Sequence, residues 1–104
     1  MVEHVNGQRL EELVKGEKTV FCDFWASWCG PCRMLAPVFE KVAESYDGKA
    51  VFVKINVDEE EQTAYKYGIS SIPNVLAIQN GKVVGNSLGF VPAATLSAFV
   101  EKHI

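Results

Sequence analysis

The chain alternates between segments with strand-like and helix-like spacing of hydrophobic residues. Residues 19–25 ("TVFCDFW") and 50–57 ("AVFVKINV") are almost continuously apolar and rich in β-branched and aromatic side chains, which is typical of central strands covered on both faces. Residues 74–79 ("NVLAIQ") indicate a third buried strand. The Asn-Gly pair that follows is a strong hairpin signal, so residues 82–88 are expected to return beside it as an antiparallel strand.

Helical patterns lie between these strands and after them. The clearest helix follows the first buried strand and carries apolar side chains on one face, at Leu35, Val38, Phe39, Val42, Ala43 and Tyr46. An earlier helix is expected between the cap Asn6 and Gly16. A third would begin in the acidic run 58–61 and stop at Gly68, and a last one would have Pro92 in its first turn.

The order of elements predicts the architecture. With a short first strand in residues 2–5, the order is β-α-β-α-β-α-β-β-α. Helices between the early strands imply parallel crossovers, whereas the final hairpin is antiparallel. We therefore expect an α/β fold in a single domain over residues 1–104, with a mixed central sheet and helices on both faces.

Composition narrows the classes of function. The 104 residues are 48% hydrophobic and 22% charged, an ordinary globular composition. A net charge of -3 with scattered lysines argues against a nucleic acid partner, and no apolar run approaches the roughly 20 residues of a membrane span. The first residues lack the basic and apolar blocks of a secretory signal, and the three cysteines cannot all pair internally. We expect a cytoplasmic protein, a monomer, that interacts with neither membrane nor nucleic acid.

The segment "ASWCGPCRM" carries the candidate chemistry. Cys29 opens the clearest helix, whose unpaired N–H groups and partial positive charge favour a thiolate, so the pKa of Cys29 should be lowered. Residues three apart in a helical turn lie at a separation that a disulfide accepts, so Cys29 and Cys32 can pair and separate repeatedly. Gly30 leaves the approach of another sulfur open. Pro31 has no N–H to donate to the Cys29 sulfur, which should make the couple more reducing. This interpretation requires an accessible, readily ionised first sulfur.

Two other interpretations of the cysteine pair are weaker. Zinc sites usually need four ligands, and the other candidates, Cys22, His4 and His103, do not have ligand spacing. A purely structural disulfide between Cys29 and Cys32 would close a very small loop and gain little entropic stabilisation. No metal site is expected.

Four segments together resemble the thioredoxin family, in the family's order and separations: "DFWASWCGPCRMLAP", "KINVDEE", "YGISSIPNVLAIQNGKVV" and "LGF". The resemblance covers essentially the whole chain. It implies a mixed five-stranded sheet flanked by four helices and the activity of a general protein-disulfide reductase. It also implies that no cofactor is bound, that a thioredoxin reductase (an NADPH-dependent flavoprotein or a ferredoxin-linked enzyme) restores the dithiol, and that substrates are protein disulfides such as those of reductive enzymes and peroxiredoxins.

The resemblance also assigns roles to two charged residues in strands. Asp23 lies in an apolar strand, where burial should raise its pKa; the resemblance implies that it is the acid and base that exchanges a proton with Cys32. The alternative is a buried carboxylate satisfied by hydrogen bonds. Lys54 resembles the family's lysine that modulates the charge of this aspartate, and the alternative is a solvated position at the sheet edge.

A docking surface is implied around the cysteines. Pro73 resembles a cis-proline packed against the pair, which would leave the backbone of Ile72 free to bond an extended substrate segment; a plain strand-start proline is the alternative. Trp28 would border the site and Trp25 would pack beneath it. The implied apolar rim consists of Gly30, Pro31, Gly68, Ile72, Gly89 and Phe90.

Three positions depart from the family pattern. Asn74 stands where threonine is usual, Pro92 replaces a small polar cap, and Cys22 takes an aliphatic position. Cys22 is interpreted as a small buried hydrophobe, with a regulatory thiol as the alternative. Two rival functions are a binding module within a larger assembly and an oxidase or isomerase of the secretory route; the Gly-Pro dipeptide and the missing signal argue against the second.

Overall fold

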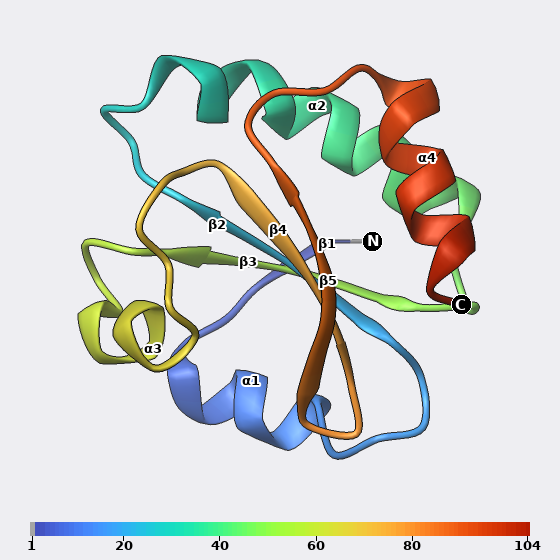
Figure 1. The fold of residues 1–104 in the computed structure, drawn as a ribbon, viewed down its shortest axis with the longest axis horizontal. Coiled ribbons are helices and arrows are strands. Elements are labelled where there is room, and N and C mark those ends of the chain that lie inside the picture. Colours follow the sequence, from blue (N-terminus) through green and yellow to red (C-terminus); the bar gives the residue numbers. More distant parts are fainter. Residues whose placement is uncertain (1) are drawn as a thin grey trace.

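The computed structural model describes residues 2–104 as one mixed sheet with helices on both faces (Figure 1). Its elements, in chain order, are β1 (Val2–His4), α1 (Gly7–Leu13), β2 (Val20–Trp25), α2 (Gly30–Ser45), β3 (Val51–Asn56), α3 (Glu61–Lys66), β4 (Asn74–Gln79), β5 (Lys82–Leu88) and α4 (Ala93–Lys102). The predicted order of elements and the predicted fold class are confirmed.

The sheet has the strand order β1-β3-β2-β4-β5. Strands β1, β3 and β2 run parallel, and β4 and β5 run antiparallel to their neighbours. Residues Asn80 and Gly81 make the hairpin turn, with φ of 52° and 76°, a conformation that asparagine and glycine tolerate best. The parallel order places the carboxyl ends of β2 and β3 at the same edge, where ligand and catalytic sites of open α/β sheets gather.

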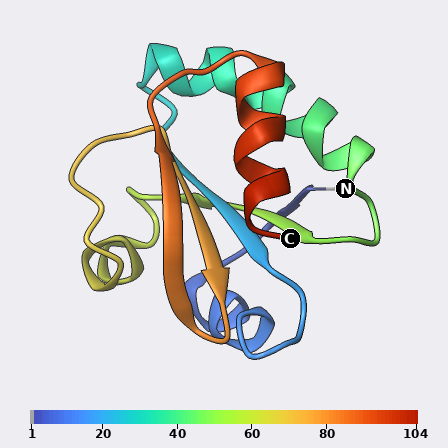
Figure 2. The same cartoon turned by 45° about the vertical axis from the view of Figure 1, so that its right-hand side comes forward.

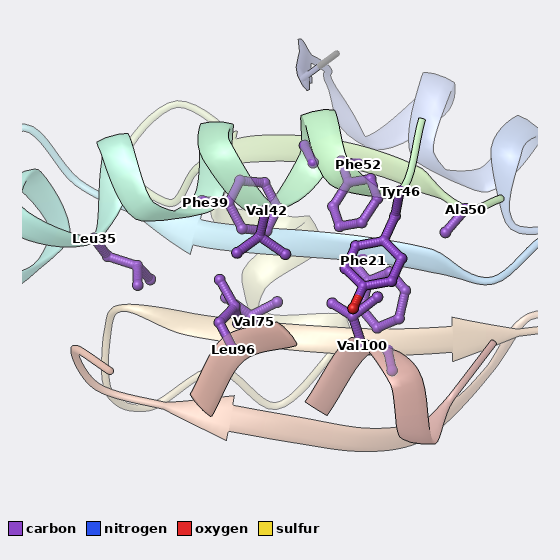
Figure 3. Packing of buried hydrophobic residues seen from close by; sticks show 12 residues of the cluster. Phe21, Leu35, Phe39, Val42, Tyr46, Ala50, Phe52, Val75, Leu96 and Val100 are labelled. Atoms are coloured by element: carbon purple, nitrogen blue, oxygen red, sulfur yellow. The ribbon is translucent and has the colours of Figure 1, made fainter. Parts of the chain in front are cut away.

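Two cores fill the space on either side of the sheet. Helices α2 and α4 cover one face and α1 and α3 the other (Figures 1 and 2). Because successive strand residues point to opposite faces, Phe21 and Phe52 join the first core while Cys22 and Val53 join the second. Figure 3 shows Leu35 and Phe39 of α2 directed toward the first core, with side chains from α4 and the strands. This packing anchors α2, whose first turn carries the cysteine pair.

Two helix ends differ from the sequence prediction. Helix α1 ends at Leu13 rather than at Gly16, because the chain turns after Val14 and the Gly16 N–H donates to the Leu13 carbonyl. Pro92 is the residue before α4 rather than part of its first turn, since its ψ of 165° is extended. The predicted cap Asn6 is confirmed, since its side chain accepts a hydrogen bond from the Arg9 N–H.

Helix α3 begins later than the sequence predicts. Only Glu61 lies within α3. The N–H groups of Glu59 and Glu60 instead donate to the carbonyl of Asn56, and the Asn56 side chain accepts from the Asp58 N–H. An asparagine that bonds its own downstream backbone favours a turn over a helix, which accounts for the delay.

Candidate active site

Cys29 and Cys32 form a disulfide at the beginning of α2, with their Cα atoms 5.2 Å apart. Cys29 is the residue before the first helical turn, and its extended backbone directs Sγ toward the open N–H groups of the helix. The Cys32 N–H donates to the Cys29 sulfur at 3.2 Å. Pro31 lies in the first turn and has no N–H to add. The Cys29 sulfur therefore occupies the position where a helix stabilises an anion.

The two cysteines are less exposed than the sequence analysis predicts. Cys29 is 5% exposed and Cys32 is 2% exposed, so both residues are buried, although Cys29 is the more exposed of the two. The reason is packing: Trp25 and Ile72 lie against the pair, and the Ile72 carbonyl oxygen is 3.9 Å from Cys29 Sγ. A reacting sulfur must therefore approach beside the backbone of Ile72.

The peptide bond between Ile72 and Pro73 is cis, as the resemblance implied. The Pro73 carbonyl accepts a 2.7 Å hydrogen bond from the Gly89 N–H, which ties this loop to the segment after β5. Neither the N–H nor the carbonyl of Ile72 takes part in a backbone hydrogen bond among residues 2–104. The backbone therefore leaves both groups for an added strand, and the carbonyl oxygen contacts only Cys29 Sγ, at 3.9 Å, among the hydrogen bonds of residues 2–104.

Asp23 lies in the middle of β2 and is 0% exposed. Neither of its carboxylate oxygens has a hydrogen-bond partner among the described residues, so no protein group there satisfies the buried carboxylate. Burial raises the pKa of Asp23 to about 6, and the positive charge of Lys54 opposes this rise. The carboxyl group can therefore take up or release a proton near neutral pH.

Lys54 is the register partner of Asp23 on the neighbouring strand β3. It is 8% exposed, so the alternative of a solvated edge position is wrong. Its Nζ atom lies 4.9 Å from the centre of the Trp25 ring. Since register partners point to the same face, the charge of Lys54 is held on the side of the sheet that carries Asp23 and α2.

Trp28 stands at the surface beside the pair and is 67% exposed. Its indole N–H donates to Asp58 Oδ2 at 2.9 Å. The sequence analysis did not identify Asp58 as the partner of Trp28. The position of Asp58 just after β3 could have indicated it, because β2 and β3 end at the same edge of the sheet. Asp58 thus fixes the orientation of an otherwise exposed indole.

A small cavity of about 150 Å³ opens beside Trp28. It is lined by Trp28, Val57, Ala64, Ile69, Ser70, Ser71 and Ile72. Sequence reasoning identified only Trp28 and Ile72 of this set. Gly68, which was expected on the rim, ends α3 with a φ of 68° and does not line the cavity, where Ser70 and Ser71 are found.

The other rim residues lie on two segments that reach the site. Gly30 and Pro31 form the first turn of α2, and Pro31 is exposed. Gly89 has a φ of 82° and bonds to Pro73, and it is followed by Phe90, which is 41% exposed. Within the predicted rim, Gly89 is joined to the Pro73 loop and Ile72 packs against the cysteine pair, and the docking role of the rim stays a prediction.

The departures from the family pattern lie outside the cysteine pair. Cys22 is a free cysteine buried in the core on the α1 and α3 side, where burial raises the pKa of its thiol well above the ordinary value. That position supports its interpretation as a small hydrophobe. Asn74 accepts a 3.3 Å hydrogen bond from the Asn86 side chain, which links β4 to β5 next to Pro73.

Residues 2–104 contain neither a metal-binding cluster nor a membrane-spanning helix. Across residues 2–104, no group of three or more His, Cys, Asp and Glu side chains is arranged to hold a metal ion. Within the same range, none of the helices has the length and apolar character needed to cross a membrane.

The chain is similar to known proteins in both sequence and fold. The thioredoxin family model matches residues 1–102. The chain is 52% identical over 104 residues to the chloroplastic M-type thioredoxin of Pisum sativum, covering 99% of this chain and 60% of that protein. It is 49% identical over 88 residues to the thioredoxin of Bacillus subtilis, covering 85% of each chain. The chain thus spans less than two thirds of the length of the pea relative but most of the bacterial one.

Structural similarity extends over the whole sheet and its helices. The thioredoxin of Malassezia sympodialis (Mala s 13) superimposes with a TM-score of 0.93 at 34% identity, covering 99% of this chain and 90% of that one. Combined with the disulfide at the beginning of α2, these matches show that the chain belongs to the thioredoxin family of protein-disulfide oxidoreductases, which act by thiol–disulfide exchange.

Proposed function

We propose that this protein is a general protein-disulfide reductase in which Cys29 attacks the substrate and Cys32 resolves the resulting intermediate. The position of Cys29 carries the proposal. Its sulfur accepts the Cys32 N–H at the beginning of α2, and Cys29 is the more exposed of the two residues. A thiolate at a helix N-terminus is stabilised, and the more accessible thiolate is the one that meets a substrate.

The reaction takes place in two exchanges. The Cys29 thiolate attacks one sulfur of the substrate disulfide, forms a mixed disulfide and releases the other substrate sulfur as a thiolate. The Cys32 thiolate then attacks Cys29 Sγ, releases the second substrate sulfur and leaves the Cys29–Cys32 disulfide. Two electrons pass from the protein dithiol to the substrate, whose thiolates take up protons. No bound cofactor is needed for either exchange.

Asp23 would accept the proton that Cys32 must lose before the second exchange. Its carboxyl group is buried and has no hydrogen-bond partner among the described residues, and burial raises its pKa to about 6. A general base with a pKa near the working pH is the most effective one. Lys54 would keep part of the Asp23 population ionised, because its positive charge lowers the pKa that burial raises.

Substrates would dock along the loop that contains Pro73. The unpaired N–H and carbonyl of Ile72 offer two main-chain hydrogen bonds to an extended segment, as in strand addition. The apolar rim of Gly30, Pro31, Gly89 and Phe90 and the cavity beside Trp28 would accept apolar side chains next to the substrate disulfide. Gly68 stays part of the proposed surface, since it directly precedes Ile69, which lines the cavity.

The partners follow from the direction of electron flow. A reductase must return two electrons to the Cys29–Cys32 disulfide, and a thioredoxin reductase that draws on NADPH or ferredoxin fits that requirement. Substrates would be protein disulfides, such as those formed by reductive enzymes and peroxiredoxins during turnover. We propose a monomer of one domain that works in a reducing compartment such as the cytoplasm; its relatives include bacterial proteins and a chloroplastic one.

A trapping experiment tests the assignment of the two cysteines. Cys32→Ser should accumulate a covalent complex with a disulfide substrate such as insulin, since the second exchange is blocked. Cys29→Ser should give no such complex, and the unsubstituted protein should reduce insulin catalytically when coupled to a reductase. A complex that forms equally well with Cys29→Ser would overturn the assignment.

A further inference from the structure

Lys54 is held by an aromatic ring instead of an acidic partner. Its Nζ atom lies 4.9 Å from the centre of the Trp25 ring, within the range of a cation–π interaction. Among residues 2–104, Lys54 takes part in no salt bridge, and neither oxygen of Asp23 accepts a hydrogen bond. Lys54 is nevertheless only 8% exposed. A nearly buried ammonium needs a stabilising neighbour, and the Trp25 ring is the one that the structure provides.

The sheet register brings four side chains together. Asp23 on β2, Lys54 on β3 and His4 on β1 are consecutive register partners, so they form a row across the parallel strands. Trp25 follows Asp23 by two positions on β2 and therefore points to the same face. The ring of His4 packs edge-on against the ring of Trp25, with centroids 6.2 Å apart. Trp25 is thus in contact with both basic side chains of the row.

We propose that Trp25 is a positioning residue for thiol–disulfide exchange: its ring holds the Lys54 ammonium beside the buried carboxyl group of Asp23, so that Lys54 acts on Asp23 by charge without a direct ion pair. A lysine has four flexible side-chain bonds and a strongly hydrated head, and without the ring its charge would move toward solvent. The inference rests on the proposed proton exchange between Asp23 and Cys32.

The charges around Asp23 determine the direction in which its pKa should change when Trp25 is substituted. Lys54 faces Asp23 from β3, and His4 lies one strand further away on β1. From α2, Cys29 and Cys32 approach the same face, and in the disulfide form they do not titrate. Losing the held Lys54 charge would raise the pKa of Asp23, whereas letting water into the space left by Trp25 would lower it. The sign of the change therefore distinguishes the two effects.

Nuclear magnetic resonance of the side-chain carboxyl carbon of Asp23, followed against pH in the oxidised protein, tests the proposal. Trp25→Leu should raise the midpoint of the Asp23 titration by about half a pH unit, and Lys54→Gln should raise it by about one. Trp25→Phe should stay close to the unsubstituted protein, because it retains an aromatic face. It has a smaller ring than tryptophan and lacks the indole N–H, which has no partner among the described residues.

A double-substitution cycle supplies the control. In a Lys54→Gln background, Trp25→Leu should no longer raise the midpoint, because no charge is left to be held. Each variant is measured both with His4 and with His4→Gln, so that the contribution of the neighbouring His4 side chain is separated from that of Lys54. Trp25→Met is a second variant without an aromatic ring, in case Trp25→Leu does not fold.

The proposal is overturned if Trp25→Leu and Trp25→Met leave the midpoint unchanged or lower it while Lys54→Gln raises it. It is also overturned if Trp25→Phe behaves like Trp25→Leu. The titration uses no substrate, so it is independent of the catalytic role of Asp23. That role is tested separately by Asp23→Asn: an unaltered rate and pH profile of mixed-disulfide resolution would remove Asp23 from the reaction but leave the positioning of Lys54 intact.

Discussion

The indole N–H of Trp28 donates to Asp58 Oδ2 at 2.9 Å, which joins the loop before Cys29 to the turn after β3. Asp58 is itself fixed, since its N–H donates to the Asn56 side chain at 2.9 Å. Trp28 also lines the small cavity that Ile72 closes on another side. An exposed tryptophan is therefore held as one wall of the surface on which substrates are proposed to dock.

Substituting Asp58 should weaken substrate docking without altering the chemistry. We expect Asp58→Ala to raise KM for a protein disulfide about two- to fivefold, which corresponds to roughly 1 kcal/mol or less for one hydrogen bond at the surface. The value of kcat should be nearly unchanged. Asp58→Asn keeps an oxygen acceptor and should restore most of the loss. Steady-state insulin reduction checks this, and a fall in kcat with constant KM would contradict it.

The stability of the oxidised protein should depend on the ionisation of Asp23. Burial raises the pKa of Asp23 to about 6 in the folded state, from an ordinary value of 3.8. The folded state therefore holds this proton more tightly than the unfolded state does between these two pH values. The free energy of unfolding should fall as pH rises through this window, and the favourable contribution is lost above it.

Asp23→Asn removes this penalty and should stabilise the protein at pH 7 by about 2–3 kcal/mol, the equivalent of the raised pKa. At pH 4 the gain should be small, because Asp23 is then protonated in the folded protein. Denaturant unfolding of both proteins across this pH range measures the difference. A difference that does not vary with pH would show that Asp23 ionisation is not its source.

Pro31 should set the reduction potential of the pair. Cys29 Sγ accepts one N–H, from Cys32, and Pro31 in the same turn has none to offer. Pro31→His adds an N–H and a basic ring, so it should stabilise the Cys29 thiolate and make the couple more oxidising by tens of millivolts. Equilibration with glutathione buffers measures the potential. A more reducing Pro31→His variant would contradict this explanation.

Cys22 should behave as part of the core. It is fully buried among apolar residues, and burial raises the pKa of its thiol. In the native reduced protein we expect alkylating reagents to spare Cys22, and Cys22→Ala to cost about 1 kcal/mol of stability with no change in insulin reduction. Rapid alkylation of Cys22 before unfolding, followed by mass spectrometry, would instead support a regulatory thiol.

The order of elements was predictable because local signals agree along the chain. The Asn80-Gly81 turn, the Asn6 cap and the continuous apolar strands each have one reasonable interpretation. The start of α3 could not be predicted in the same way. The side chain of Asn56 accepts a hydrogen bond from the backbone of the acidic run, and the helix begins only after that turn. Acidic composition alone does not report that bond.

The parts of the site that depend on local backbone geometry could be predicted from the sequence. Cys29 and Cys32 follow a buried strand and open a helix, so their closeness follows from local geometry. Contacts between strands were less predictable. Asp58 reaches Trp28 over a separation of 30 residues, and Lys54 lies on Trp25 rather than in solvent. The narrow access to Cys29 also depends on Ile72, which is 43 residues away.

The most direct test of the account is the pH dependence of alkylation in the reduced protein, with the modified cysteine identified by mass spectrometry. If Cys29 is the attacking thiolate, it should react before Cys32, with a half-maximal rate well below the pH of about 8.5 at which an ordinary cysteine ionises. Faster reaction at Cys32, or a half-maximal rate for Cys29 at or above that pH, would contradict the account.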